Sequence, residues 1–216
     1  MFSKSVSALA AIAFLGVLPG PRQASSQTSQ KKPTKNEVAV AHARERVLAI
    51  LREENGCTAW FREADPDAAG VFESLQIGIA KKKQEFVQRT TNERGEHSYR
   101  HPWGGRSNQM AGPGSLVQVN PDGPFFTVTL PVVETRPGGQ ILFFGGFRIL
   151  TVGGFPGDSP EAQTTILLHE LAHVIGRIPE DDDSWDGRSS RNTDEVLRNC
   201  RGEIVETAQR ASHASR

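Results

Sequence analysis

Residues 164–176 read TTILLHELAHVIG, and this stretch is the most informative part of the sequence for the fold. Most of its residues are apolar, and on a helix they would occupy every face rather than one stripe. This is typical of a helix that is buried all round. Just upstream, Ser159 suits the capping position of a helix and Pro160 its first helical position. Gly176 follows the last expected helical residue, where glycine commonly ends a helix. The sequence therefore predicts a buried helix over 160–175.

Within this helix, His169 and His173 are four residues apart, and Glu170 lies between them. Side chains four apart on a helix are neighbours on one face, so both imidazoles can reach one metal ion. Burying such groups among apolar residues is unfavourable unless they have a partner. Glu170 lies about 100° around the helix from His169, beside the ion, where a general base for an attacking water belongs. The spacing therefore predicts a metal site with an adjacent general base.

The pattern is similar to the His-Glu-x-x-His signature of zinc-dependent metallopeptidases, and at these residues the chain resembles the zincin clan. The resemblance implies that His169 and His173 bind Zn²⁺ and that Glu170 is the catalytic base for a zinc-bound water. It also implies an α+β fold: an N-terminal helix, a small antiparallel or mixed sheet, the metal-binding helix and a C-terminal helix. In that clan an edge strand before the metal-binding helix pairs with an extended peptide, and we expect it at 147–152.

A catalytic zinc takes three protein ligands, so a third residue must join the two histidines. The metzincin branch extends the signature by a glycine, matched by Gly176, and by a histidine, where this chain has Pro179. Four acids follow. Some small secreted zincins have aspartate there, so the resemblance favours Asp181 as the third ligand and Asp182 next. The same acids could instead form a solvated loop or bind calcium.

Other candidates for the third ligand are Glu180, Asp183, Asp194, Glu195 and His213. The strongest of them is Glu195, on a predicted C-terminal helix. The pattern also gives Glu195 a role that needs no metal, because Asn192 is expected to cap that helix with Glu195 as the reciprocal acid.

Residues 90–114 are rich in glycine and polar residues and are expected to form a long loop. The loop contains His97, His101 and Tyr99, the one tyrosine of the chain. Zincins often use a tyrosine or histidine to stabilise the developing oxyanion, so these residues are candidates if the loop folds over a cleft. The alternative is a surface loop with no part in the site.

The remaining elements are expected from periodicity and turn signals. They are a helix over 36–55 ended by Gly56, strands over 75–80, 116–119 and 125–130, and one or two strands over 141–152 broken at Gly145-Gly146.

The N-terminus has the features of a secretory signal peptide, since Lys4 precedes an apolar run over 6–17 and small residues follow. We expect a signal peptide over 1–26, a polar linker over 27–35 and a single zincin-like domain over 36–216. After removal of the signal, no apolar run is long enough for a membrane span. The expected location is therefore secreted, either periplasmic or extracellular.

Cys57 and Cys200 are the two cysteines of the chain. In an oxidising compartment they are expected to form a disulfide bond. A thiolate that inhibits the zinc as an additional ligand is the alternative.

The 25 basic and 25 acidic residues balance, which argues against nucleic acid as a partner. The resemblance implies a secreted zinc metallopeptidase, an endopeptidase acting on peptide or protein substrates. The alternative is a zincin-like domain that binds metal or a partner without peptidase activity. A zinc hydrolase of other amide bonds would share the same chemistry.

Overall fold

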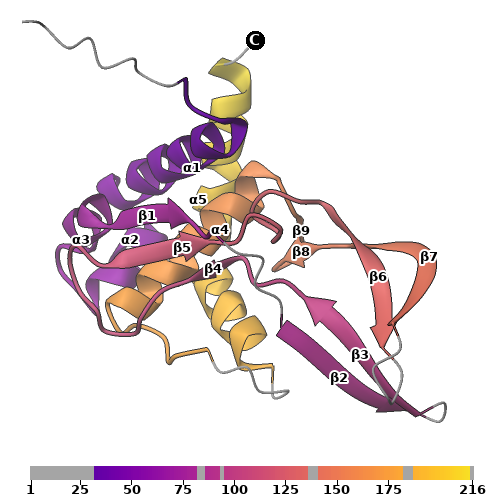
Figure 1. Cartoon of the computed structure of the whole chain (residues 1–216). Helices are drawn as coiled ribbons and strands as arrows, with labels where there is room; N and C mark the ends of the chain where they lie inside the picture. Colours follow the sequence, from indigo (N-terminus) through magenta and orange to yellow (C-terminus); the bar gives the residue numbers. More distant parts are fainter. Residues whose placement is uncertain (1–31, 82–85, 93–94, 136–140, 182–186, 215–216) are drawn as a thin grey trace, which may run out of the picture. The chain divides into compact units, whose positions relative to one another are not determined.

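The computed structural model describes residues 32–81, 86–92, 95–135, 141–181 and 187–214. Within these ranges the chain forms five helices and three small sheets, an α+β architecture as predicted (Figure 1). All of these elements belong to one unit, Pro33–Arg216. The predicted signal peptide lies outside the described residues, as do Asp182 and Asp183. None of the described helices is long and apolar enough to cross a membrane.

Three helices precede the first strand, and each begins at a side chain that caps the free backbone N–H groups of its first turn. The caps are Thr34, Asn55 and Asp67. The helices are α1 (Lys35–Arg52), α2 (Gly56–Arg62) and α3 (Ala68–Ser74). The prediction that Gly56 ends the first helix is wrong, because Asn55 caps a new helix in which Gly56 is the first residue.

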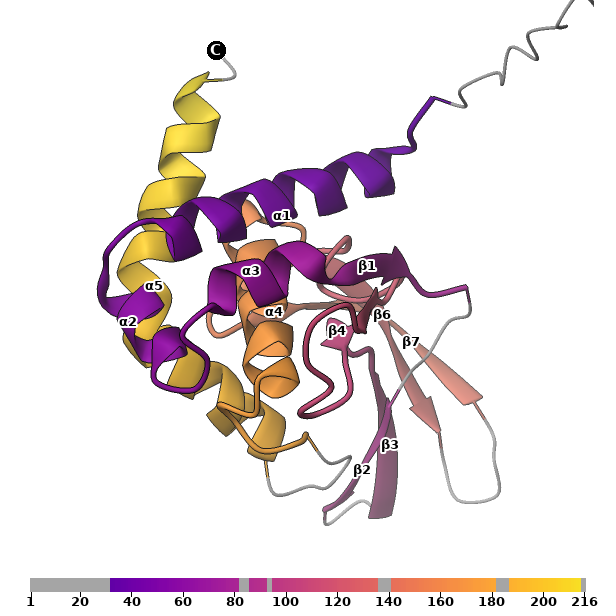
Figure 2. The same cartoon turned by 90° about the vertical axis from the view of Figure 1, so that its left-hand side faces the viewer.

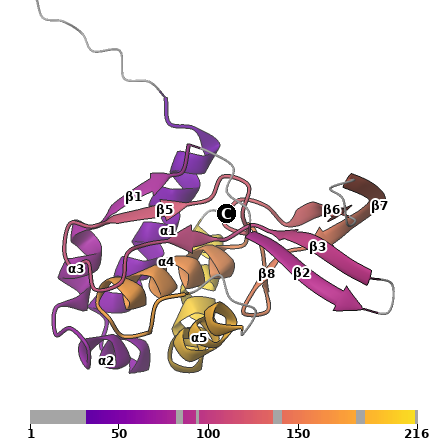
Figure 3. The same ribbon diagram turned by 60° about the horizontal axis from the view of Figure 1, so that its bottom comes forward.

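The predicted buried helix is α4 (Pro160–Val174), and its start at the Ser159 cap is confirmed. Every residue from Ala162 to Val174 is buried. The end at Gly176 is also confirmed, because this residue has a φ of +71°, a conformation that glycine adopts without strain. Helix α4 packs against α1 and against α5 (Arg188–Ala214), as Figures 2 and 3 show.

The first sheet has three strands in the order β1-β5-β4. Strands β1 (Gln76–Ile79) and β5 (Leu116–Val119) are parallel, and both fall where the sequence predicts strands. The short strand β4 (Gly105–Arg106) pairs antiparallel with β5 and forms an edge of the sheet. It also contacts α4, which brings a sheet edge to the helix with the two histidines.

The second sheet is antiparallel throughout, with the order β2-β3-β6-β7. Its strands are β2 (Phe86–Asn92), β3 (Gly95–His101), β6 (Thr129–Thr135) and β7 (Ile141–Ile149). A two-stranded ribbon follows, formed by β8 (Thr151–Val152) and β9 (Phe155–Pro156).

Three strand and loop predictions differ from the structure. The expected loop over 90–114 contains β3, β4 and the end of β2. The expected strand over 125–130 begins only at Thr129, because backbone bonds to Gly123 O form a turn and bury Phe125 in the core. The expected break at Gly145-Gly146 is absent, since β7 runs through both glycines and ends at Ile149.

The hydrophobic core lies between the first three helices, α4, α5 and β5. Its largest fully buried side chains include Phe61, Phe72, Phe125 and Leu168. The predicted disulfide between Cys57 and Cys200 is confirmed and joins α2 to α5 across 143 positions of the sequence. Because it closes so long a loop, it stabilises the fold by on the order of 5 kcal/mol in the chain-entropy treatment.

Candidate metal centre

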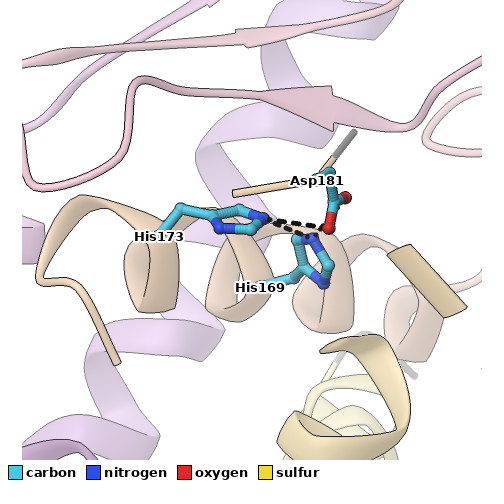
Figure 4. Close-up of side chains that lie close together, drawn as sticks. All are labelled: His169, His173 and Asp181. Carbon is cyan, nitrogen blue, oxygen red and sulfur yellow. Dashed lines mark hydrogen bonds and ion pairs between the residues drawn. The ribbon is translucent and has the colours of Figure 1, made fainter. Parts of the chain in front are cut away.

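Three side chains converge at one end of α4: His169 and His173 from the helix and Asp181 from the segment after it (Figure 4). The His169 Nε2 atom lies 2.9 Å from His173 Nε2 and 3.0 Å from Asp181 Oδ2. The second carboxylate oxygen, Asp181 Oδ1, lies 3.4 Å from His173 Nε2. One ligand atom from each residue lies within 4.8 Å of the others, so the three can surround a single ion.

The turn after α4 brings Asp181 back to the histidines. Gly176 reverses the chain, and the backbone N–H groups of Arg177 and Ile178 then bond to Ala172 O at 2.8 and 3.4 Å. The Ile178 side chain is buried and anchors the segment against the core. Asp181 therefore has a defined place although it lies outside any helix or strand.

The donor set fits a divalent transition metal. Two imidazole nitrogens and one carboxylate oxygen are ligands that zinc accepts, and three protein ligands leave a position for substrate or water. His169 and His173 are buried, and the lone pairs of their Nε2 atoms repel at 2.9 Å unless a proton or cation lies between them. Among the described residues, these three form the one group of acids, histidines or cysteines with such an arrangement.

The acid–base properties of the site also favour a cation. Burial opposes ionisation of Asp181, but hydrogen bonds with His169 and His173 outweigh it and hold the pKa of the carboxyl far below its usual value. Burial alone would lower the pKa of His169. The hydrogen bond to Asp181 and the charge of Glu170 reverse this and raise the pKa above its ordinary value. Asp181 is therefore an anion, the form in which a carboxylate binds a metal.

Glu170 lies beside this group and is buried. Its Oε2 atom accepts a hydrogen bond of 2.7 Å from the Ser107 hydroxyl group. Burial raises the pKa of Glu170 and exceeds the opposing effects of His169, His173 and Ser107. A carboxylate with a raised pKa takes up a proton more readily, as a general base must.

Two glycines allow β4 to lie directly against α4 at Glu170. A Cβ atom on Gly105 would lie 2.7 Å from Glu170 Oε1 and 2.9 Å from Ile166 Cγ2. A Cβ atom on Gly104 would lie 2.8 Å from Ile166 Cδ1. A side chain at either position would force Ile166, Glu170 or the strand to shift, so glycine favours this close approach of strand and helix.

Gly104, Gly105 and Ser107 also belong to the site, although the sequence did not predict them. A pair of glycines shortly before a serine was the available signal, but it lay in a segment interpreted as a loop. The predicted edge strand over 147–152 is confirmed only in part. Residues 147–149 end β7, which is an edge strand of its sheet, but 151–152 belong to the separate strand β8. The edge strand that reaches Glu170 is β4.

The rival ligands lie elsewhere. Glu195 forms an ion pair with Arg198, and neither Glu195 nor Asp194, Glu180 or His213 belongs to the group of candidate ligands. Asn192 does not cap α5, which begins at Arg188. Its side chain bonds instead to Asp181.

Three candidates for the oxyanion stabiliser stay untested. His97, Tyr99 and His101 belong to strand β3, and their side chains lie outside the described part of the molecule.

Comparisons with protein-family models, with curated proteins and with solved structures give no match to this chain. The evidence for its function therefore comes from the residues and geometry of the chain itself.

Proposed function

We propose that the chain is a zinc metallopeptidase of zincin type, in which His169, His173 and Asp181 hold the metal and Glu170 is the general base. The observation that carries the proposal is the convergence of two imidazoles and a carboxylate next to a buried glutamate. A structural role alone would not account for four buried or half-buried ionisable groups in one place, because burying them is unfavourable.

In this proposal, the bound metal supplies Lewis-acid polarisation of the substrate carbonyl. Glu170 accepts a proton from the water that attacks the carbonyl carbon, and then transfers that proton to the nitrogen of the leaving amine. The raised pKa of Glu170 suits a group that holds a proton between two steps.

Strand β4 supports a peptide as the substrate. It is the edge of its sheet and lies beside Glu170. An extended peptide could add to this edge through backbone hydrogen bonds, which would place a peptide bond near the base.

The disulfide between Cys57 and Cys200 is consistent with an oxidising location outside the cytoplasm. Together with the apolar run near the N-terminus, it supports our proposal that the peptidase is secreted.

The substitution Glu170→Gln tests the proposal directly. The amide keeps the shape of the side chain but cannot accept the proton, so we expect hydrolysis to fall about 10²–10⁴-fold. Metal content, measured by mass spectrometry, should stay unchanged. Cleavage is measured with casein and with an unbiased peptide library. Full activity of the Glu170→Gln variant would contradict the proposed mechanism.

A metal-binding module without peptidase activity is the second candidate function. The observation that favours it is the Ser107 hydroxyl group, which already donates a hydrogen bond to the base carboxylate. A melting temperature that falls on chelation, together with no cleavage of any library peptide, would support this alternative.

A further inference from the structure

Two neighbouring residues of α5, Asn192 and Thr193, contact two of the three candidate ligands. The Asn192 amide nitrogen lies 2.6 Å from Asp181 Oδ1, and the Thr193 hydroxyl oxygen lies 3.2 Å from His169 Nδ1. The atoms they contact, Asp181 Oδ1 and His169 Nδ1, are not the atoms that make the shortest contacts among the ligands, which are Asp181 Oδ2 and His169 Nε2. We propose that Asn192 and Thr193 are positioning residues that prepare Asp181 and His169 to bind the metal, an inference that rests on the proposed function.

The Asn192 side chain fixes the segment that carries Asp181. Its amide nitrogen has two hydrogens, and two acceptors lie within bonding distance: Pro179 O at 2.8 Å and Asp181 Oδ1 at 2.6 Å. One amide group therefore holds both ends of the segment 179–181. Asn192 is itself buried, with 5% of its surface exposed, so water does not readily replace it.

Asn192 and His169 contact different oxygens of Asp181, and Oδ1 also lies 3.4 Å from His173 Nε2. The Asn192 amide engages Oδ1, and Oδ2 faces His169 Nε2 at 3.0 Å. The carboxylate is thus oriented before any metal binds.

Thr193 determines which nitrogen of His169 carries a proton. Its hydroxyl group has one hydrogen, which it donates to the Ser189 carbonyl oxygen at 3.0 Å. Because that hydrogen is used, the contact with His169 Nδ1 requires the ring to donate N–H to the hydroxyl oxygen. Nδ1 then carries the proton, and Nε2 is the nitrogen that faces the other ligands.

The other histidine differs. His173 Nδ1 is buried and has no hydrogen-bond partner among the described residues. Helix α5 therefore supports His169 and Asp181 but not His173. Groups that orient metal ligands in this way typically change metal affinity about 10–100-fold when they are removed.

The test measures Co²⁺ affinity by titrating the metal-free chain and following the visible absorption of the bound ion. Thr193→Val and Asn192→Leu keep the size of each side chain but remove its hydrogen bonds. We expect each variant to bind Co²⁺ about 10–100-fold more weakly than the unaltered chain, with an altered absorption spectrum. Thr193→Ser retains the hydroxyl group, and we expect it to restore both affinity and spectrum.

Thr207→Val is the matched control, since Thr207 is a buried threonine further along the same helix. It should bind Co²⁺ like the unaltered chain. Melting temperatures of the metal-free variants are compared as well, because a loss of folding alone would not be restored selectively by serine. If one variant fails to fold, the other decides.

The outcomes separate this inference from the proposed function. Tight Co²⁺ binding by the unaltered chain and by both isosteric variants, with one common spectrum, would overturn the positioning role and leave the metal site intact. An equal loss in Thr193→Ser and Thr193→Val would overturn the role of the hydroxyl group. If the unaltered chain bound no Co²⁺ or Zn²⁺, the proposed function would fail and this inference with it.

Discussion

Asp181 differs from the other two candidate ligands because it lies in no helix or strand. It reaches the histidines through the turn at Gly176 and through the Asn192 amide group. Hydrogen bonds with His169 and His173 outweigh the effect of burial and keep the pKa of its carboxyl below the ordinary value, which favours the charged form. Among the three candidate ligands, the negative charge comes from this one side chain.

The substitution Asp181→Asn tests that role. It keeps the shape of the side chain but removes the charge and one metal-binding oxygen. We expect Zn²⁺ affinity to fall by more than the roughly 10–100-fold that is typical of losing a group outside the ligand set. Affinity is measured by competition with a chromophoric chelator. Glu180→Gln is the control, because Glu180 is the adjacent acid and is exposed. Equal affinity of both variants would rule out Asp181 as a ligand.

At the scale of elements, the sequence predicts α4 well and β4 not at all. Ser159, Pro160 and Gly176 are local signals, and the spacing of the histidines depends only on helix geometry. Strand β4 has two residues, too few for any alternation to be visible, and its position depends on contacts with α4.

The contacts of Asn192, like the position of β4, could not be predicted from the local sequence. A helix-capping role is a local interpretation of its sequence context. Its actual partners, Pro179 and Asp181, are 13 and 11 positions away, and only the packing of α5 on the turn after α4 brings them together.

The close approach of β4 to α4 gives a second prediction, for Gly105→Ala. The new methyl group would lie 2.8 Å from Glu170 Cγ and 2.9 Å from Ile166 Cγ2, so the strand or the base must move. We expect a loss of about 1–3 kcal/mol in the free energy of unfolding. We also expect peptidase activity to fall while zinc is retained.

Gly202→Ala is the matched control for that experiment. Gly202 lies within α5, and a Cβ atom there meets no other atom within 4 Å. Alanine should stabilise this helix by about 0.5–1 kcal/mol. Denaturant unfolding and peptide cleavage are measured for both variants. If Gly105→Ala matched Gly202→Ala in both measurements, β4 would not position Glu170.

At the scale of the whole unit, α4 is held from several directions. Helix α1 joins it through Arg46, a buried side chain that bonds to Thr164 at 3.0 Å and to Gln163 at 2.9 Å. Helix α5 packs on both α1 and α4, and the disulfide ties α5 to α2. Helix α4, which carries the two histidines, is therefore fixed by elements far apart in the sequence, and this favours a preorganised site.

Removal of the disulfide tests this arrangement. Replacing both Cys57 and Cys200 with alanine should lower the free energy of unfolding by on the order of 5 kcal/mol, because the unfolded chain gains freedom. The measurement is guanidinium unfolding of the oxidised chain, the chemically reduced chain and the double variant. Reduction should destabilise the unaltered chain and leave the double variant unchanged. Equal midpoints for all three samples would show that the bond contributes no stability.

In the proposed site, His169, His173 and Asp181 hold one zinc ion. X-ray absorption at the zinc edge of the reconstituted chain tests it most directly, because the scattering of imidazole rings is distinctive. We predict one zinc per chain with two imidazole nitrogens at about 2.0–2.1 Å and the remaining ligands oxygen. Substoichiometric zinc, or a spectrum with fewer than two imidazoles, would rule out this set of three ligands.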